Sequence, residues 1–254
     1  MFESHSYRKP CSYLITMNNW DSGVVIPVKA ASDGLKDRDK GRNIRIYLQT
    51  SNKTELISTV PVTIVDGDKI AVCSSINDPH MTTFDGRYYD NYLEGEFILY
   101  RHKSLPYEVR TYYRRCNNVA ACNCAVVVRS VDDVILIDVC GPSMGQSSRR
   151  TPHNLKMYLN GDLTPGTEII RIAGGKSYEI ILPTGAKVIV MDGRPILGRR
   201  FLNVKVVAST FDFNNTEGLC GTFDGNRAND FTERNGNVYT GGGLKPNQFS
   251  SSWR

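Results

Sequence analysis

Apolar and polar residues alternate in short runs along much of the chain. Nine such runs are rich in β-branched and aromatic residues, and Gly, Pro or Asn separates them at intervals of about ten residues. They cover residues 96–102, 107–115, 125–130, 134–140, 155–161, 168–174, 178–183, 186–192 and 202–209. In the last run Leu202, Val204 and Val206 share one face of a strand. Asn203 and Lys205 share the other. Short strands at regular spacing predict an all-β sandwich.

Two segments between these runs carry the residues of tight hairpin turns. They are NGD at residues 160–162 and PTGAK at residues 183–187. Each is expected to reverse the chain between two strands.

The first 70 residues have a different pattern. Residues 23–51 indicate a strand, a charged turn and a second strand, and residues 59–68 a further strand that ends in acidic turn residues. The last of these loosely resembles the end of a Calx-β or fibronectin-type sandwich. About the first twenty residues show no pattern. We therefore expect a small or partial β-module over residues 1–70 and a second domain over residues 71–254.

Charge and hydropathy argue against a nucleic-acid partner and against a membrane-spanning segment. The net charge of the 254-residue chain is +5, and its arginine pairs, such as those at residues 114–115, 149–150 and 199–200, lie apart. A nucleic-acid surface needs a denser stripe of cations, so we expect solvated faces and no nucleic-acid partner. A glycosaminoglycan or another acidic surface is the weaker alternative. No run approaches the ~18 apolar residues of a membrane span.

Cysteine usage indicates an extracellular chain. The seven cysteines are spread through strand-like sequence, and their odd number indicates a free thiol or a partner that is missing from this chain. Asn52 and Asn214 begin glycosylation sequons. The N-terminus has no apolar stretch of a signal peptide. We expect a piece of a longer secreted protein, or a form that has lost its leader.

Four cysteines, Cys116, Cys122, Cys124 and Cys140, lie within 25 residues. They can form two disulfides in three connectivities, which the sequence leaves open. A zinc site of four thiolates is the alternative, although the paired C-x2-C spacing of such sites is absent.

One motif, CSSINDPHMTTFDG at residues 73–86, contains an acid-labile Asp-Pro bond. The carboxyl group of Asp78 can attack its own carbonyl carbon, and the nitrogen of Pro79 then leaves once it is protonated. His80 is a candidate acid for that proton near neutral pH.

A second motif, GLCGTFDGNRANDFT at residues 218–232, is rich in side-chain oxygens. Its polar residues are Asp224, Asn226, Asn229 and Asp230. Such a loop suits a hard cation such as calcium. The loop does not match an EF-hand. Asn229 stands at the position of the required EF-hand glycine, and Asn235 stands at the position of its glutamate. The alternative is an Asn/Asp-rich turn whose side chains bind the backbone.

Together the two motifs resemble the von Willebrand factor type D domain, over about residues 71–254. The pattern is C…DPHxxTFDG, followed about 140 residues later by GLCGxFDGxxxND. The resemblance implies a disulfide between Cys73 and Cys220. With the other four cysteines in two bridges, Cys11 is then the remaining thiol, and we expect it to pair outside this chain. The resemblance also implies a calcium site that ties the two motifs together.

In that site the resemblance assigns ligand side chains to Asp85, Asp224, Asn229 and Asp230, and a backbone carbonyl to Asn226. The family often has asparagine where this chain has Thr222. A hydroxyl is a poorer, neutral ligand, so we expect a weaker site, or one in which water fills the gap.

The resemblance also bears on self-cleavage at Asp78-Pro79. Some relatives with GDPH cleave themselves at this bond in mildly acidic secretory compartments. Here Asn77 replaces the glycine, and asparagine is at best a partial substitute for an unusual backbone angle. We expect no efficient cleavage, and a structural role for NDPH.

The histidines, at positions 5, 80, 102 and 153, lie outside any nucleophile or zinc-hydrolase motif. We therefore expect no turnover catalysis. The expected function is a secreted, calcium-binding, disulfide-stabilised interaction module with extracellular or cell-surface partners in tissue development. No multimerising module is visible, so a monomer is expected.

Overall fold

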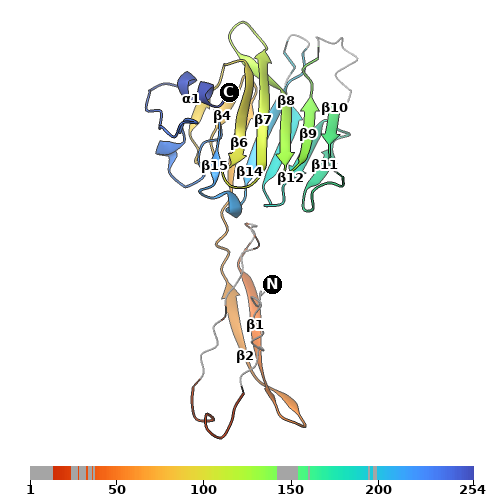
Figure 1. Ribbon diagram of the computed structural model, residues 1–254, viewed down its shortest axis with the longest axis vertical. Coiled ribbons are helices and arrows are strands. Elements are labelled where there is room, and N and C mark those ends of the chain that lie inside the picture. Colours follow the sequence, from red (N-terminus) through yellow and green to blue (C-terminus); the bar gives the residue numbers. More distant parts are fainter. Residues whose placement is uncertain are drawn as a thin grey trace. The chain divides into compact units, whose positions relative to one another are not determined.

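The structure is a computed structural model that describes residues 14–23, 28, 33, 36, 38–141, 154–159, 161–193, 195–196 and 199–254. Antiparallel strands dominate these residues (Figure 1), which confirms the expected all-β class. The chain divides into two compact units, a hairpin unit that ends at Asp68 and a sandwich unit, Lys69–Arg254. The assignment of separate domains to residues 1–70 and 71–254 stays a prediction.

The hairpin unit contains one antiparallel pair of strands, β1 (Lys40–Gln49) and β2 (Thr54–Ile64). Ile44 lies opposite Val60 on one face of the pair, and Arg45 lies opposite Thr59 on the other. The first strand expected within residues 23–51 falls largely outside the described residues.

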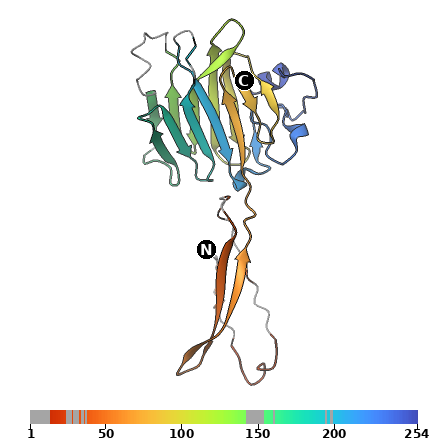
Figure 2. The same ribbon diagram turned by 180° about the vertical axis from the view of Figure 1, so that it is seen from behind.

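The sandwich unit contains two sheets, seen from opposite sides in Figures 1 and 2. The seven-stranded sheet has the order β11 (Glu168–Ile172), β12 (Ser177–Ile181), β13 (Lys187–Asp192), β14 (Leu202–Ala208), β3 (Ala71–Ile76), β4 (His80–Thr82) and β5 (Tyr88–Asp90). The six-stranded sheet has the order β10 (Asn154–Tyr158), β9 (Asp133–Asp138), β8 (Ala121–Ser130), β7 (Tyr107–Arg115), β6 (Gly95–His102) and β15 (Thr216–Glu217).

The core lies between the two sheets. In β14 the side chains of Leu202, Val204 and Val206 are buried, whereas Asn203 and Lys205 are half-exposed, as their alternation predicts. Burying one such aliphatic side chain contributes about 1.5–3 kcal/mol, so period-two alternation on both sheets explains why the sheets stack.

The two predicted hairpin turns have different outcomes. Residues 183–187 do join paired strands β12 and β13, and the N–H of Leu182 donates to the carbonyl of Ala186 at 2.8 Å. The hairpin predicted at residues 160–162 is wrong, because β10 pairs with β9 whereas β11 pairs with β12. There the chain crosses from one sheet to the other, and the N–H of Thr164 donates to the Asp133 carboxylate.

After β14 the chain has little regular structure. We call residues 209–254 the C-terminal segment; it contains two 3₁₀ turns, η2 (Thr210–Asp212) and η3 (Arg227–Asn229), the two-residue strand β15, and helix α1 (Asn247–Ser252). Aromatic rings pack this segment onto the sandwich, since Phe231 and Phe249 contact Tyr89 and Phe223 contacts Phe84. None of the helices among the described residues is long and apolar enough to cross a membrane.

Candidate metal centre

The first part of the candidate site is the turn between β4 and β5. It is formed by Thr83, Phe84, Asp85 and Gly86, and the N–H of Gly86 donates to the carbonyl of Thr83 at 3.1 Å. Gly86 has φ 84°, a left-handed conformation that glycine adopts without steric cost. The turn holds the side chain of Asp85 half-exposed at the end of the sheet.

The second part repeats the same four residue types, TFDG, at residues 222–225 of the C-terminal segment. The two turns lie against each other: the ring centroids of Phe84 and Phe223 are 6.0 Å apart. The N–H of Phe84 also donates to the carbonyl of Cys220 at 3.0 Å. The fold therefore brings together two copies of one short motif.

Asp85 and Asp224 meet at this contact. Oδ2 of Asp85 accepts hydrogen bonds from the N–H groups of Asp224, at 3.2 Å, and Gly225, at 3.0 Å. Burial, together with the neighbouring Asp224 carboxylate, raises the pKa of Asp85. For Asp224, hydrogen bonds from the Asn229 side chain and the Asn226 N–H outweigh the effect of burial and lower its pKa. The pair carries concentrated negative charge.

Asp230 is the third carboxylate and is fully buried. Its Oδ2 accepts a hydrogen bond from the Thr83 hydroxyl at 2.7 Å, whereas its Oδ1 has no hydrogen-bond partner within the described part of the chain. Burial and the charges of Asp85 and Asp224 raise the pKa of Asp230 to about 7. A buried carboxylate oxygen without a partner is energetically costly, which calls for a cation or a proton at this place.

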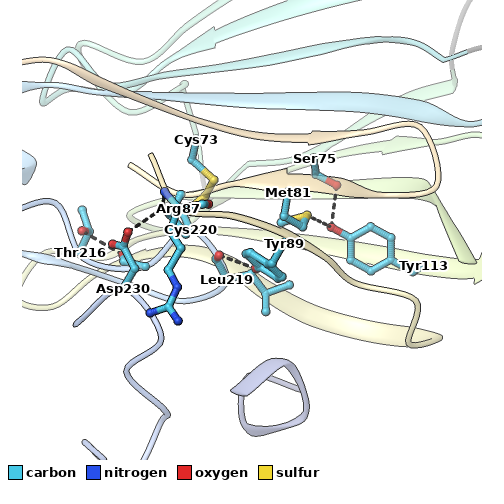
Figure 3. Close-up of a disulfide and its surroundings, with 12 residues drawn as sticks. Cys73, Ser75, Met81, Arg87, Tyr89, Tyr113, Thr216, Leu219, Cys220 and Asp230 are labelled. Carbon is cyan, nitrogen blue, oxygen red and sulfur yellow. Dashed lines mark hydrogen bonds between the residues drawn. A yellow bond between two sulfur atoms is a disulfide. The ribbon is translucent and has the colours of Figure 1, made fainter. Parts of the chain in front are cut away.

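Gly221 makes room for this carboxylate. A Cβ atom at Gly221 would come within 2.7 Å of Oδ1 of Asp230, and its φ of 71° is left-handed. Figure 3 shows Asp230 close to the Cys73–Cys220 disulfide. Glycine is therefore required beside this buried carboxylate.

The other sequence-predicted ligands lie in the same loop. The Thr222 hydroxyl donates to Oδ1 of Asn229 at 2.8 Å, and Nδ2 of Asn229 donates to Oδ2 of Asp224 at 2.7 Å. The side chain of Asn226 accepts the N–H of Ala228 and so caps η3. The carbonyl of Asn226 accepts the N–H of Asn229 at 3.2 Å, so a cation would have to share this oxygen.

These residues fit calcium in their donor chemistry. The donors are all oxygens, as hard cations require, and one of them, Oδ1 of Asp230, is buried without a hydrogen-bond partner among the residues that the structure describes. As the described residues lie, however, no three side chains of His, Cys, Asp or Glu are grouped closely enough to hold a metal ion. The Thr222–Asn229–Asp224 hydrogen bonds occupy these donors instead.

Three disulfides stabilise the unit. Cys73 in β3 is joined to Cys220, and both are fully buried. The structure also joins Cys116 to Cys122 and Cys124 to Cys140. The alternative of a four-thiolate zinc site is therefore wrong, because all four sulfurs are bonded in pairs. Cys11 lies outside the described residues.

The Asp78-Pro79 bond lies in the turn between β3 and β4. Asn77 has φ 59°, the left-handed conformation that glycine would adopt readily. Nδ1 of His80 is hydrogen-bonded to Oδ1 of Asp90 at 2.8 Å, and its Nε2 lies 3.8 Å from Oδ1 of Asp78. The candidate acid is thus oriented toward the candidate nucleophile.

Both predicted sequons are accessible. Asn52 is exposed in the turn between β1 and β2, and Asn214 is exposed just before β15. Glycosylation of either residue stays a prediction.

Sequence reasoning did not identify Thr83, Arg87 or Gly221 as parts of the site. Thr83 binds Asp230, and the Arg87 guanidinium lies 3.5 Å from the centroid of the Phe231 ring, where its charge lowers the pKa of Asp230. The repeated TFDG motif could have pointed to Thr83, because Thr222 occupies the equivalent place in the second copy. Nothing in the sequence marks Arg87.

The profile of the von Willebrand factor type D domain matches residues 73–237, which include both TFDG turns and the Cys73–Cys220 disulfide. Mucin-5AC of Homo sapiens is 28% identical over 172 residues, which are 66% of this chain and 3% of mucin-5AC. The chain thus spans a small part of the length of that relative. Because the profile covers more than half of the sequence, the chain belongs to the von Willebrand factor type D domain family.

Proposed function

We propose that the sandwich unit is a secreted, non-enzymatic interaction module that calcium stabilises. The observation that carries this proposal is Oδ1 of Asp230, a buried carboxylate oxygen without a hydrogen-bond partner among the described residues. The charges of Asp85 and Asp224 act on the same group. An oxygen-rich loop with this charge favours a divalent cation.

The side chains of Asp85, Asp224, Asn229 and Asp230 and the carbonyl of Asn226 would hold the ion. When bound, calcium supplies positive charge that offsets three carboxylates. The chain supplies the arrangement: the hydrogen bonds from the Asp224 and Gly225 N–H groups fix Asp85, and the Thr83 hydroxyl fixes Asp230. Thr222 offers a neutral hydroxyl where the family often has asparagine, so we propose a weak site.

The family and the disulfides support an extracellular location and protein partners. Three buried or partly buried disulfides persist in oxidising compartments. Mucin-5AC shares the domain but extends far beyond the aligned region. We propose cell-surface or matrix partners in tissue development and a monomeric state, with recognition through loops on a rigid β scaffold.

The absence of turnover catalysis is part of the proposal. Nδ1 of His102 accepts the N–H groups of Ser104 and Leu105, at 3.2 and 3.0 Å, so this buried ring has a structural task. His80 is oriented by Asp90 toward the backbone turn that precedes it.

Scanning calorimetry tests calcium stabilisation. The thermal midpoint should rise by several degrees when calcium replaces a chelator, as expected for a ligand that binds only the native state, and magnesium should do less. Equal midpoints in calcium and in chelator would contradict the proposal.

A second candidate function is one self-cleavage at Asp78-Pro79, and the left-handed φ of Asn77 favours it. The Asp78 carboxylate would attack its own carbonyl carbon, the bond to the Pro79 nitrogen would break as that nitrogen takes up a proton, and water would open the resulting anhydride. Incubation at about pH 5.5, followed by reducing electrophoresis and sequencing for a new N-terminal Pro79, decides this. Reduction matters, because Cys73–Cys220 holds the two pieces together.

A further inference from the structure

We propose that the cation site and the Cys73–Cys220 disulfide are coupled, so that bound calcium protects this disulfide from reduction and reduction weakens calcium binding. The inference rests on the proposed calcium site. It makes the thiol state of Cys73 and Cys220 a regulator of that site.

Cys220 lies between the two halves of the site. Its N–H donates to the carbonyl of Leu99 at 2.8 Å, and its own carbonyl accepts the N–H of Phe84, the residue before Asp85. The next residue, Gly221, lies against Oδ1 of Asp230. A shift of Cys220 therefore moves groups on both sides of the proposed cation site. Figure 3 shows Cys220 beside Asp230.

The disulfide adds a covalent link to the non-covalent contacts that hold the second turn against the first. Asp85 and Asp224 are 139 residues apart in sequence, and the disulfide closes a separation of 147. Backbone hydrogen bonds join the C-terminal segment to β6 at the two residues of β15 and at Leu219, Cys220 and Trp253. Without the disulfide, aromatic packing and scattered hydrogen bonds would hold the second turn against the first. The ligands would then be less well pre-organised, which lowers affinity.

The ion in turn restrains the disulfide. Cys73 and Cys220 have no exposed surface, so a reductant reaches them only after the local structure opens. Opening moves Cys220 away from β3 and separates Asp85 from Asp224, so the open state lacks the ligand set. Because calcium would bind only the closed state, it would reduce the population of the open state by mass action. The coupling between calcium binding and reduction of the disulfide is reciprocal. Calcium therefore disfavours reduction by the same factor by which reduction weakens calcium binding.

The chemistry is an ordinary thiol–disulfide exchange with a dithiol such as dithiothreitol as reductant. One thiolate of the reductant attacks a sulfur and forms a mixed disulfide, and the first cysteine leaves as a thiolate. The second thiolate of the reductant then closes its own ring and releases the other cysteine. Two electrons pass from the reductant, which is oxidised, to the protein disulfide.

The test measures reduction of all three disulfides in the wild-type protein under dithiothreitol, with calcium, with magnesium or with a chelator. Thiols are alkylated at intervals and assigned by mass spectrometry. At a calcium concentration about ten times Kd, reduction of Cys73–Cys220 should slow about tenfold. Cys124–Cys140 serves as the internal control, because Cys124 belongs to a separate buried cluster with Phe201.

A second arm measures calcium affinity by titration calorimetry. The double variant Cys73→Ala/Cys220→Ala should bind calcium at least about fivefold more weakly than wild type, and Cys124→Ala/Cys140→Ala should bind like wild type. If the first variant does not fold, the reduction arm on wild type still decides.

The outcomes are distinguishable. Slower reduction of Cys73–Cys220 alone supports the coupling. Calcium binding without any change in that rate overturns it and leaves the proposed function intact, and so does equal slowing of all three disulfides, which would reflect global stabilisation. If wild type gives no calcium-binding heat, the proposed function fails and the coupling with it.

Discussion

Asp85 accepts a hydrogen bond from the backbone N–H of Asp224, although 139 residues separate the two in sequence. Each residue is the third member of a TFDG turn, and the two turns contact each other through Phe84 and Phe223. Two like charges at such a contact destabilise the native state unless something offsets them. The contact between the two carboxylates is therefore electrostatically unfavourable at the point where the C-terminal segment joins the sandwich.

Asp230→Asn should have opposite effects on stability without calcium and on calcium binding. The amide keeps an acceptor for the Thr83 hydroxyl and removes a buried charge, so in chelator the variant should be more stable than wild type by about 1 kcal/mol. Its calcium response should be lost. Urea unfolding in calcium and in chelator measures both effects. Asp162→Asn, at an exposed residue, is the matched control and should change neither. A variant less stable than wild type in chelator would contradict this interpretation.

Removal of the Cys73–Cys220 disulfide should lower the free energy of unfolding substantially. Cys73→Ala/Cys220→Ala opens a sequence separation of 147 residues, and the chain-entropy model gives a loss of about 4–5 kcal/mol. The pair Cys116→Ala/Cys122→Ala, with a separation of six, should lose clearly less. Chemical denaturation of both variants checks the order. Equal losses would show that loop closure does not determine this stability.

Alkaline pH should destabilise the sandwich. Burial, reinforced by Asp212 at Tyr100, raises the pKa of Tyr100 and Tyr113 above the ordinary value of 10.0. The folded state then favours the neutral phenol, so stability is intact below pH 10 and falls as the pH rises through 10 toward the folded-state values. Urea unfolding from about pH 8 to 11 checks this.

Tyr113→Phe should reduce the loss of stability that occurs as the pH rises above 10. Its hydroxyl is hydrogen-bonded to the Ser75 hydroxyl at 2.9 Å, so the variant should also lose about 1 kcal/mol at neutral pH. Tyr112→Phe, at an exposed position of the same strand, should match wild type. A wild-type alkaline slope in Tyr113→Phe would exclude Tyr113 as its source.

The turn before Asp78 should tolerate glycine better than alanine. Asn77 has a left-handed φ of 59°, and its N–H donates to Oδ1 of Asn203, a bond that any non-proline residue retains. Asn77→Gly should be near neutral, whereas Asn77→Ala should lose about 1 kcal/mol from backbone strain. Thermal unfolding compares them. Equal stability of both variants would argue against strain at this position.

Period-two alternation predicted the strands of the sandwich because burial on one face repeats every second residue. It could not distinguish a hairpin from a crossing between sheets, since residues 160–162 have turn chemistry in either case. The choice depends on strand pairing, and β11 pairs with β12 rather than with β10.

The candidate site was predictable in its acidic residues and not in its supporting contacts. Asp224 and Asp230 stand out because carboxylates in glycine-containing loops are typical of cation sites, whereas Asp85 was added by the resemblance to the family. Gly221 and Arg87 act through close approach and through ring stacking in three dimensions, which no local pattern encodes. The pairing of Cys116, Cys122, Cys124 and Cys140 likewise depends on which strands lie together.

The most direct test of calcium binding is a calorimetric titration of wild type and Asp85→Asn. The substitution keeps an oxygen to accept the Asp224 and Gly225 N–H groups and removes one ligand charge. Wild type should bind one calcium ion per chain, and Asp85→Asn should bind about tenfold more weakly or not at all. Asp162→Asn should match wild type. Equal affinity of Asp85→Asn and wild type would contradict the assignment of this site.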